Sequence, residues 1–275
     1  MDKFQEWRKD KNKAGEAFER LIEIIRFLRS ENGCPWDREQ THESLKKCLI
    51  EECYEVIDAI DKKDRDLLEE ELGDLILQAV FHAILSEERS DFDMKDILNR
   101  VSNKMIYRHP HVFLTENAEN SAESLDKALI KWENMKRQEK RLKTYAEAMD
   151  NIPNNLPALM RSNKIQKKAA DVGFDWMDVR EAFNKVKEET GELEEIYLSG
   201  DQDHIKEEIG DLIFSVVNVS RMLGVDPEEA LNFTSEKFIK RFRFIEETAV
   251  QVGINLEEMS LEEMDKLWDK AKNSL

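Results

Sequence analysis

Apolar residues recur at intervals of three and four along most of the chain, which is the pattern of helices with one buried face. Two neighbouring stretches show it clearly: Leu49, Cys53, Val56, Ala59 and Ile60, then Leu68, Leu72, Leu75, Ala79 and Val80. Alternating apolar and polar positions, the pattern of strands, are hard to find. Only nine glycines and five prolines occur in 275 residues, which favours long helices. The pattern therefore predicts an all-α fold.

Segments that contain proline mark the breaks between these helices. GCPWD at 33–37 is typical of a turn before a helix, and HPH at 109–111 indicates the end of another. NIPNNLP at 151–157 is typical of a linker between two halves. We therefore predict an N-terminal helical repeat at 1–143, a linker at 144–160 and a C-terminal helical repeat at 161–275.

An acidic sequence occurs on both sides of this linker. EECYEVIDAIDKKDRDLLEEELGDLIL at 51–77 is matched by EETGELEEIYLSGDQDHIKEEIGDLIF at 188–214, with the same gap of 16 residues between the acidic clusters. The matching pairs are Glu51 and Glu188, Glu52 and Glu189, Glu55 and Glu192, Glu70 and Glu207, Glu71 and Glu208, Asp74 and Asp211, Lys104 and Lys237, Arg108 and Arg241, and Trp132 and Trp268. A tandem duplication of one helical unit explains them together.

Each copy places two acids on each of two consecutive helices. Glu189 and Glu192 are three residues apart, so they share one face of a helix, and Glu208 and Asp211 repeat the arrangement on the next. The segment YLSGDQD at 197–203 is short enough to make the two helices antiparallel neighbours. Four carboxylates from facing helices can then converge on one point.

The acids are interleaved with the apolar stripes of these helices, where unpaired carboxylates repel one another and lose hydration. A divalent cation removes that conflict, and an all-oxygen set suits Mg²⁺ or Mn²⁺ better than zinc or copper. The alternative is a solvated acidic face, which is common on Glu-rich helices. Duplication at identical spacing favours the metal site. The equivalent set in the first copy is Glu52, Glu55, Glu71 and Asp74.

Candidate phosphate and base contacts follow the second acidic segment. Lys237 and Arg241 are four residues apart on a predicted helix, so they share a face, and Arg241 can bind phosphate with two donors. Trp268 could stack on a base. Lys185, one turn before Glu189, is a further phosphate candidate. The alternatives are ordinary solvated bases and a tryptophan of the core or an interface.

Taken in order, these motifs resemble the all-α nucleoside triphosphate pyrophosphohydrolases, and among them the two-repeat MazG family. The resemblance covers nearly the whole chain. The acidic motif alone is moderately specific, whereas the ordered series is highly specific. The segments that carry it are GCPWDREQTHESL, EECYEVIDAI, EELGDLILQAVFHA, RHPHVF, LPALMRSNKIQKKAADVGFDW and EEIGDLIFSVVN.

The resemblance implies a Mg²⁺-dependent enzyme that hydrolyses nucleoside triphosphates of many bases between the α and β phosphates. The products would be the monophosphate and pyrophosphate, and the protein would be a homodimer of helical bundles. Lys237 and Arg241 would hold phosphates and Trp268 would contact the nucleoside. The second repeat would be the active one. Its implied metal ligands are Glu189, Glu192, Glu208 and Asp211.

Hydrolysis at the α-phosphorus also needs a group that accepts a proton from the attacking water. Glu188 and Glu207 are neighbours of the predicted metal ligands and are the candidate bases. In the first repeat, Arg108 is followed by His-Pro-His, so we expect its helix to end there. This difference between the copies accords with an active second repeat.

Charge and composition restrict the partners. With 60 acidic and 42 basic residues the formal net charge is −18, which argues against broad contact with a nucleic-acid polymer or an anionic membrane. No apolar run approaches the ~20 residues of a membrane span, and the N-terminal segment lacks an apolar signal core, so we expect a cytoplasmic protein. Cys34, Cys48 and Cys53 form neither a disulfide framework nor a zinc pattern, and we expect Cys48 and Cys53 to be small core residues.

Two rival interpretations belong to other functional classes. A ferritin-like di-metal oxidase needs a Glu-x-x-His motif on each of two helices, and the sequence has one such motif, at Glu39 and His42. A helical adaptor protein would leave its acids solvated and would not be stabilised by a metal ion.

Overall fold

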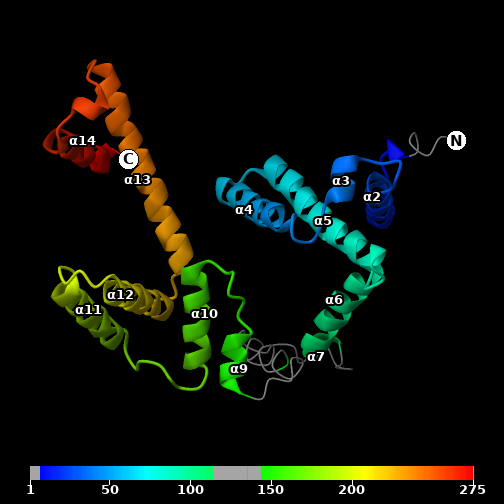
Figure 1. Ribbon diagram of the computed structural model, residues 1–275, viewed down its shortest axis with the longest axis horizontal. Helices are drawn as coiled ribbons and strands as arrows, with labels where there is room; N and C mark the ends of the chain where they lie inside the picture. The colour runs from blue at the N-terminus through cyan, green and yellow to red at the C-terminus, as the bar shows by residue number, and fades with distance from the viewer. Residues whose placement is uncertain (1–6, 114–134, 136–143, 275) are drawn as a thin grey trace. The chain divides into compact units, whose positions relative to one another are not determined.

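The computed structural model of the protein describes residues 7–113, 135 and 144–274, which form helices and no strand (Figure 1). This confirms the all-α prediction. The chain divides into two compact units, Met1–Lys136 and Arg137–Leu275. Among the described helices, none combines the length and the apolar character needed to cross a membrane.

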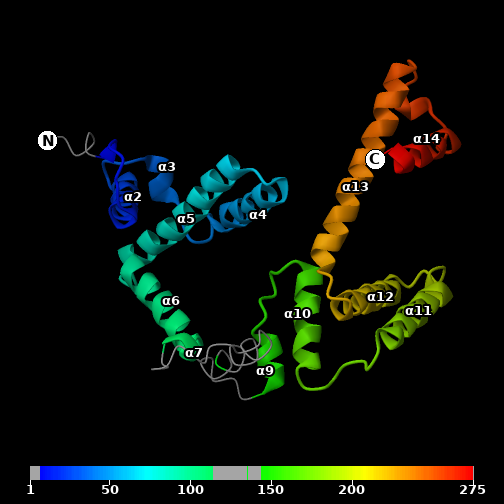
Figure 2. The same ribbon diagram turned by 180° about the vertical axis from the view of Figure 1, so that it is seen from behind.

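The first unit is built around one long helix. Its core joins the second half of this helix to the N-terminal helix, through buried residues such as Ile25, Val80 and Ile84. The acidic half of the long helix extends beyond that core and pairs with the preceding helix (Figure 2). The helices of the unit are α2 (Ala14–Leu28), α3 (Pro35–Glu39), α4 (Lys46–Lys62), α5 (Arg65–Glu88), α6 (Met94–Arg108) and α7 (Pro110–Phe113).

The turn before α3 and the end of α6 are confirmed as predicted. Gly33 donates its backbone N–H to the Ser30 carbonyl. A Cβ at this position would lie 2.2 Å from the carbonyl oxygens of Phe27 and Leu28, so only glycine fits the turn. The helix α6 ends at Arg108, where the His-Pro-His segment begins.

The second unit holds a matching pair of antiparallel helices, α11 and α12, followed by the long helix α13 (Figure 1). Glu228 in the first turn of α13 accepts a hydrogen bond from the Met160 backbone in α10 at 3.2 Å. The helices of the unit are α9 (Tyr145–Asp150), α10 (Ala158–Ala170), α11 (Val179–Ile196), α12 (Gln202–Met222), α13 (Pro227–Gln251), η2 (Leu256–Glu258) and α14 (Leu261–Ser274).

The two helical pairs have the same kind of turn between their helices. Lys63 and Gly200 occupy equivalent places in the two repeats, and both have left-handed backbone, with φ of 56° and 79°. The next residue in each copy, Asp64 or Asp201, caps the second helix by accepting hydrogen bonds from its first-turn N–H groups. The duplicated sequence thus encodes the same hairpin twice.

The predicted linker at 144–160 contains α9 and the start of α10. These two helices pack against each other, and α10 also packs against α12 and α13. The segment 151–157, which contains the two prolines, joins α9 to α10. In the structure the predicted linker is therefore part of the second unit, and Met149 in α9 lines the cavity described below.

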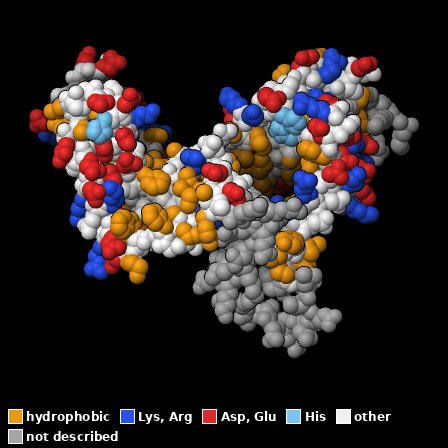
Figure 3. All heavy atoms as spheres, turned by 60° about the horizontal axis from the view of Figure 1, so that its bottom comes forward, with side chains coloured by type: hydrophobic (Ala, Val, Ile, Leu, Met, Phe, Trp, Pro, Cys, Tyr) orange, Lys and Arg blue, Asp and Glu red, His pale blue; other side chains and the backbone are white. Residues whose placement is uncertain are grey.

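Apolar faces remain uncovered on both units. Ile209, Ile213 and Val216 on α12 are 42%, 48% and 49% exposed, and α4 and α13 carry further exposed apolar residues. Figure 3 shows such side chains gathered in patches among acidic ones. Cys53 is also exposed, so the expectation that it is a core residue was wrong. Faces of this kind are typical of surfaces that another chain covers.

Candidate functional site

Three of the four predicted ligands of the second repeat converge between α11 and α12. Oxygen atoms of Glu189, Glu192 and Glu208 all lie within 4.8 Å of one another. The Glu189 side chain is buried, Glu208 is half-buried and Glu192 is exposed. Asp211, one turn after Glu208 on α12, lies outside this group of three and is exposed.

The clustering affects the ionisation of Glu192. The pKa of Glu192 is raised above its ordinary value, first by its hydrogen bond with Glu189, and then by partial desolvation and by the charges of Glu189 and Glu208. Such crowding disfavours the charged form of the Glu192 carboxyl. The group therefore lacks positive charge, which a bound cation could supply.

Lys185 supplies part of that charge. Its Nζ lies 2.7 Å from an oxygen of Glu188 and 2.5 Å from an oxygen of Glu189. These two contacts raise the pKa of Lys185 well above its ordinary value, so the side chain is fully charged at neutral pH. A flexible ammonium group in this position can exchange its carboxylate partners for a phosphate when a metal ion takes them over.

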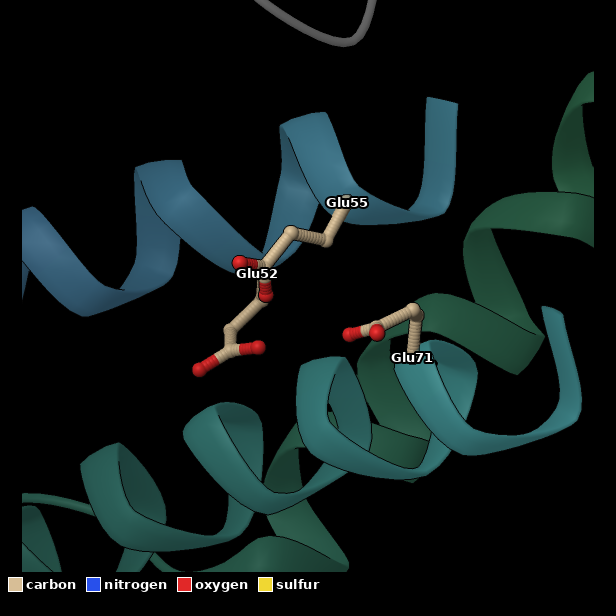
Figure 4. A group of neighbouring side chains, drawn as sticks. All are labelled: Glu52, Glu55 and Glu71. Carbon is tan, nitrogen blue, oxygen red and sulfur yellow. The ribbon is translucent and has the colours of Figure 1, made fainter. Parts of the chain in front are cut away.

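The first repeat forms an equivalent group. Glu52 and Glu55 on α4 and Glu71 on α5 reach into the space between the two helices, with oxygens within 4.8 Å of one another (Figure 4). The pKa values of Glu52 and Glu71 are raised, first by desolvation and then by the neighbouring acids. Asp74 contributes to both shifts through its charge but, like Asp211, lies outside the group of three.

Both groups fit a hard divalent cation. Their ligand atoms are all carboxylate oxygens from two helices, which suit Mg²⁺ or Mn²⁺. The mutual repulsion of the acids, visible in their raised pKa values, is what a bound cation relieves. A set of three acids also leaves coordination positions for water and for phosphate oxygens.

A cavity of about 630 Å³ adjoins the carboxylates of the second repeat. Lys185, Glu189 and Asp211 form part of its lining, so Asp211 lines the same cavity as Glu189, one of the group of three. Phe174 and Trp176 contribute aromatic surface. The volume lies within the range of ligand sites, ~300–1,000 Å³, and the charged groups lie along part of a largely apolar lining.

Sequence reasoning missed the polar groups in the rest of the cavity. They are Gln166, Asp175, Ser215, Asn218 and Arg221. Asp175 and Trp176 belong to the GFDW segment, which the sequence singled out without giving it a role. Helical periodicity does not reveal Asp175, because it lies outside any helix, between α10 and α11, and its partner Arg221 lies on α12.

Lys185 lines the cavity, whereas the other predicted phosphate and base contacts lie on α13 and α14. The Arg241 guanidinium lies 5.6 Å from the centre of the Trp268 ring, and Trp268 also packs against Phe238 at 5.0 Å. Lys237 lies 5.6 Å above the Phe233 ring. None of these residues of α13 and α14 is among those lining the cavity. Trp132, the predicted counterpart of Trp268, lies outside the described residues.

The two candidate bases occupy different surroundings. Glu188 is exposed and is held by Lys185, whereas Glu207 is exposed on α12. Neither belongs to the group of three carboxylates. The single Glu-x-x-His motif does not lie on one helix, because α3 ends at Glu39 and the His42 ring pairs instead with His82, their Nδ1 atoms 2.7 Å apart.

Comparison with known proteins identifies the repeated unit. The model of the MazG nucleotide pyrophosphohydrolase domain matches residues 40–113 and again 179–244. These two matches contain both carboxylate groups, so the duplication inferred from the sequence is a duplication of this domain.

Relatives match over nearly the full length. The nucleoside triphosphate pyrophosphohydrolase/pyrophosphatase MazG of Thermotoga maritima is 46% identical over 94% of this chain and 97% of its own. The nucleoside triphosphate pyrophosphohydrolase of Escherichia coli K12 is 44% identical over 92% of this chain and 96% of its own. The crystal structure of a mazG-related protein from T. maritima is 35% identical and covers 43% of this chain and 98% of its own, with a TM-score of 0.37. The chain therefore belongs to the MazG nucleotide pyrophosphohydrolase family and is an enzyme.

Proposed function

We propose that the chain hydrolyses nucleoside triphosphates at the α–β phosphate bond, releasing the nucleoside monophosphate and pyrophosphate. The reaction depends on Mg²⁺, with Mn²⁺ as a possible substitute, and accepts many bases. The relatives named above support the reaction type. The observation that supports the second repeat as the site is the cavity, which joins the buried Glu189 and the Lys185 ammonium to an apolar space of nucleoside size.

The proposal gives each group a role. Glu189, Glu192, Glu208 and Asp211 hold Mg²⁺, which supplies positive charge to the triphosphate and polarises the attacking water. Lys185 exchanges Glu188 and Glu189 for a phosphate oxygen and so adds a further positive charge. The apolar lining of the cavity excludes bulk water from the reacting phosphate, which strengthens these electrostatic contacts.

The products test the bond assignment directly. Phosphorus NMR of a reaction containing ATP and Mg²⁺ should show AMP and pyrophosphate appearing together at equal rates. Appearance of ADP and orthophosphate would place cleavage at the β–γ bond and overturn the proposal. Absence of any product across a panel of nucleoside triphosphates would remove these substrates altogether.

The base that accepts the proton from water remains a choice between Glu188 and Glu207. Replacing each by glutamine keeps the size of the side chain but removes its basicity, so the true base should lose about 100-fold or more in kcat. Glu188→Gln also frees Lys185 from one partner, so the pH profile of kcat separates the two effects. Wild-type rates in both variants would exclude both residues.

Mg²⁺ should stabilise the protein, and low pH should abolish that effect. In the metal-free protein the folded pKa values of Glu71 and Glu192 lie above the ordinary value. The folded state therefore binds protons more tightly than the unfolded state, and without metal these acids lower stability increasingly as pH rises through their folded pKa. Mg²⁺ competes with those protons, so its stabilisation is present at pH 7 and disappears as pH falls toward 4.5.

Thermal melts would measure this effect. At about 100 times its dissociation constant, Mg²⁺ should raise Tm by about 5–10 °C at pH 7. A double variant Glu52→Gln and Glu192→Gln, which has lost one ligand from each group, is the control and should show a much smaller shift. No shift in the wild-type protein would favour the adaptor interpretation, in which the acids are merely solvated.

The protein acts as a homodimer in this proposal. The apolar face of α12 is exposed, and Lys237, Arg241 and Trp268 are not among the residues that line the cavity beside Glu189 in their own unit. A second copy covers that face and brings these three residues to the cavity if its α13 and α14 lie over the carboxylates. The substrate contacts expected of these three residues are then made across the interface.

A further inference from the structure

The cavity beside the carboxylates contains a hydrogen-bonded chain of three side chains. Asn218 on α12 accepts two hydrogen bonds through Oδ1 from Arg221, at 3.1 Å from Nε and 2.8 Å from Nη2. Arg221 Nη2 in turn lies 2.5 Å from Asp175. Asp175 and Arg221 are 26% and 15% exposed, so solvent has limited access to the pair.

This chain fixes which way the Asn218 amide points. An arginine guanidinium only donates hydrogen bonds, so the atom of Asn218 that faces it is the carbonyl oxygen. The amide NH₂ then remains as the group that Asn218 can offer to a molecule in the cavity. Asp175 orients Arg221, and Arg221 orients Asn218, so the donor is held in place before any ligand arrives.

Gln166 offers the opposite polarity in the same cavity. It is 7% exposed, and its Nε2 donates to the Phe214 carbonyl at 2.8 Å. Its Oε1 is buried and has no hydrogen-bond partner. A buried acceptor without a partner costs about 1–3 kcal/mol, and a ligand N–H that reached it would remove that cost. Gln166 and Asn218 both line the cavity, so its wall contains one oriented donor and one buried, unsatisfied acceptor.

A nucleobase with adjacent N–H and C=O groups matches this pair. Hypoxanthine, guanine, uracil and thymine carry such an edge. In the same pose, adenine and cytosine would turn an amino group toward the Asn218 NH₂ and an unprotonated ring nitrogen toward the Gln166 oxygen. Both contacts are repulsive, and both leave buried groups unpaired. Phe174 and Trp176 can hold the base plane, while the triphosphate is anchored at the carboxylates.

We propose that Asn218 and Gln166 are specificity-determining residues within the broad acceptance of this enzyme. They favour bases with a C=O group at this edge (oxo bases) over bases with an amino group there (amino bases). Arg221 and Asp175 are positioning residues. This inference rests on the proposed function, because the triphosphate bound at the second repeat brings the base into the cavity. An oxo base gains one hydrogen bond and avoids one mismatch. We therefore expect its kcat/KM to be about tenfold higher than that of the matching amino base.

Matched pairs of substrates provide the test. ITP and ATP differ at the proposed edge, as do UTP and CTP, so the ratio of their kcat/KM values isolates base recognition from chemistry. The wild-type ratios ITP/ATP and UTP/CTP should be about ten. In Asn218→Ala both should fall toward one. Asn218→Asp replaces the donor by an acceptor and should shift both ratios further in favour of the amino bases.

Arg221→Leu tests the positioning role. It frees the Asn218 amide to turn, so the kcat/KM ratios should fall as in Asn218→Ala. A simple loss of folding would instead lower the activity on both substrates of a pair equally and leave their ratio unchanged. Wild-type ratios near one, or ratios that Asn218→Ala leaves unchanged, would overturn the inference. Absence of pyrophosphate from all four substrates in the wild-type protein would instead overturn the proposed function.

Discussion

Replacing Glu192 by alanine should lower pyrophosphate release by about 100-fold to 1,000-fold, whereas the equivalent Glu55→Ala should leave most of it. Glu192 is hydrogen-bonded to Glu189, and its oxygen lies within 4.8 Å of a Glu208 oxygen. Removing it takes away one proposed ligand and leaves the buried Glu189 with Lys185 and Glu208 as its charged neighbours. In the proposed function, the bound cation would then be lost or displaced, and the triphosphate would lose its main source of positive charge.

The Glu55→Ala variant is a matched control, because Glu55 occupies the same place in the first group of three. Steady-state pyrophosphate release with saturating Mg²⁺ would be measured for both variants, with thermal melts to establish that each is folded. Loss confined to Glu55→Ala would move the site to the first repeat. Partial loss in both would indicate two working or coupled sites.

The carboxylate groups could be predicted from sequence because local geometry determines them. A spacing of three residues places Glu189 and Glu192 on one face of a helix, and a short connection forces the next helix to return alongside. The left-handed Gly200 and the Asp201 cap complete the turn. Each of these features is readable within a few residues, and their repetition in the first copy supplied an independent check.

The cavity could not be predicted, because it depends on contacts between distant segments. Asp175 and Arg221 are 46 residues apart in the chain, and Gln166 reaches the carbonyl of Phe214 from another helix. Periodicity shows which face of a helix is apolar but not which segment covers it. The signal in the sequence is Asp175 next to Trp176, an acid within an otherwise apolar segment. Such an acid indicates a cationic partner elsewhere in the chain.

The same limit applies to Lys237 and Arg241. Their spacing predicted a shared helical face, and the structure places Arg241 over Trp268 in agreement with a common cluster. Nothing in the spacing says which surface that cluster faces. Within the second unit it packs between α13 and α14, apart from the lining of the cavity, which is why the proposed function assigns it to the neighbouring copy.

A heterodimer of two inactive variants should therefore recover activity. Arg241→Ala removes a cation that can bind phosphate with two donors, so the homodimeric variant should lose about 100-fold in kcat/KM. Glu192→Ala is inactive for a different reason, on a different element. If each site combines the carboxylates of one subunit with the α13–α14 cluster of the other, a mixed dimer has one site with both defects and one site with none.

Co-expression of the two variants with different affinity tags allows the mixed dimer to be purified in two steps. Its pyrophosphate release should be about half that of the wild-type dimer, since one of its two sites is intact. The two homodimeric variants, purified in the same way, are the controls and should stay inactive. A mixed dimer as inactive as these controls would mean that Arg241 acts on the carboxylates of its own subunit, and a monomeric wild-type protein would remove the shared site altogether.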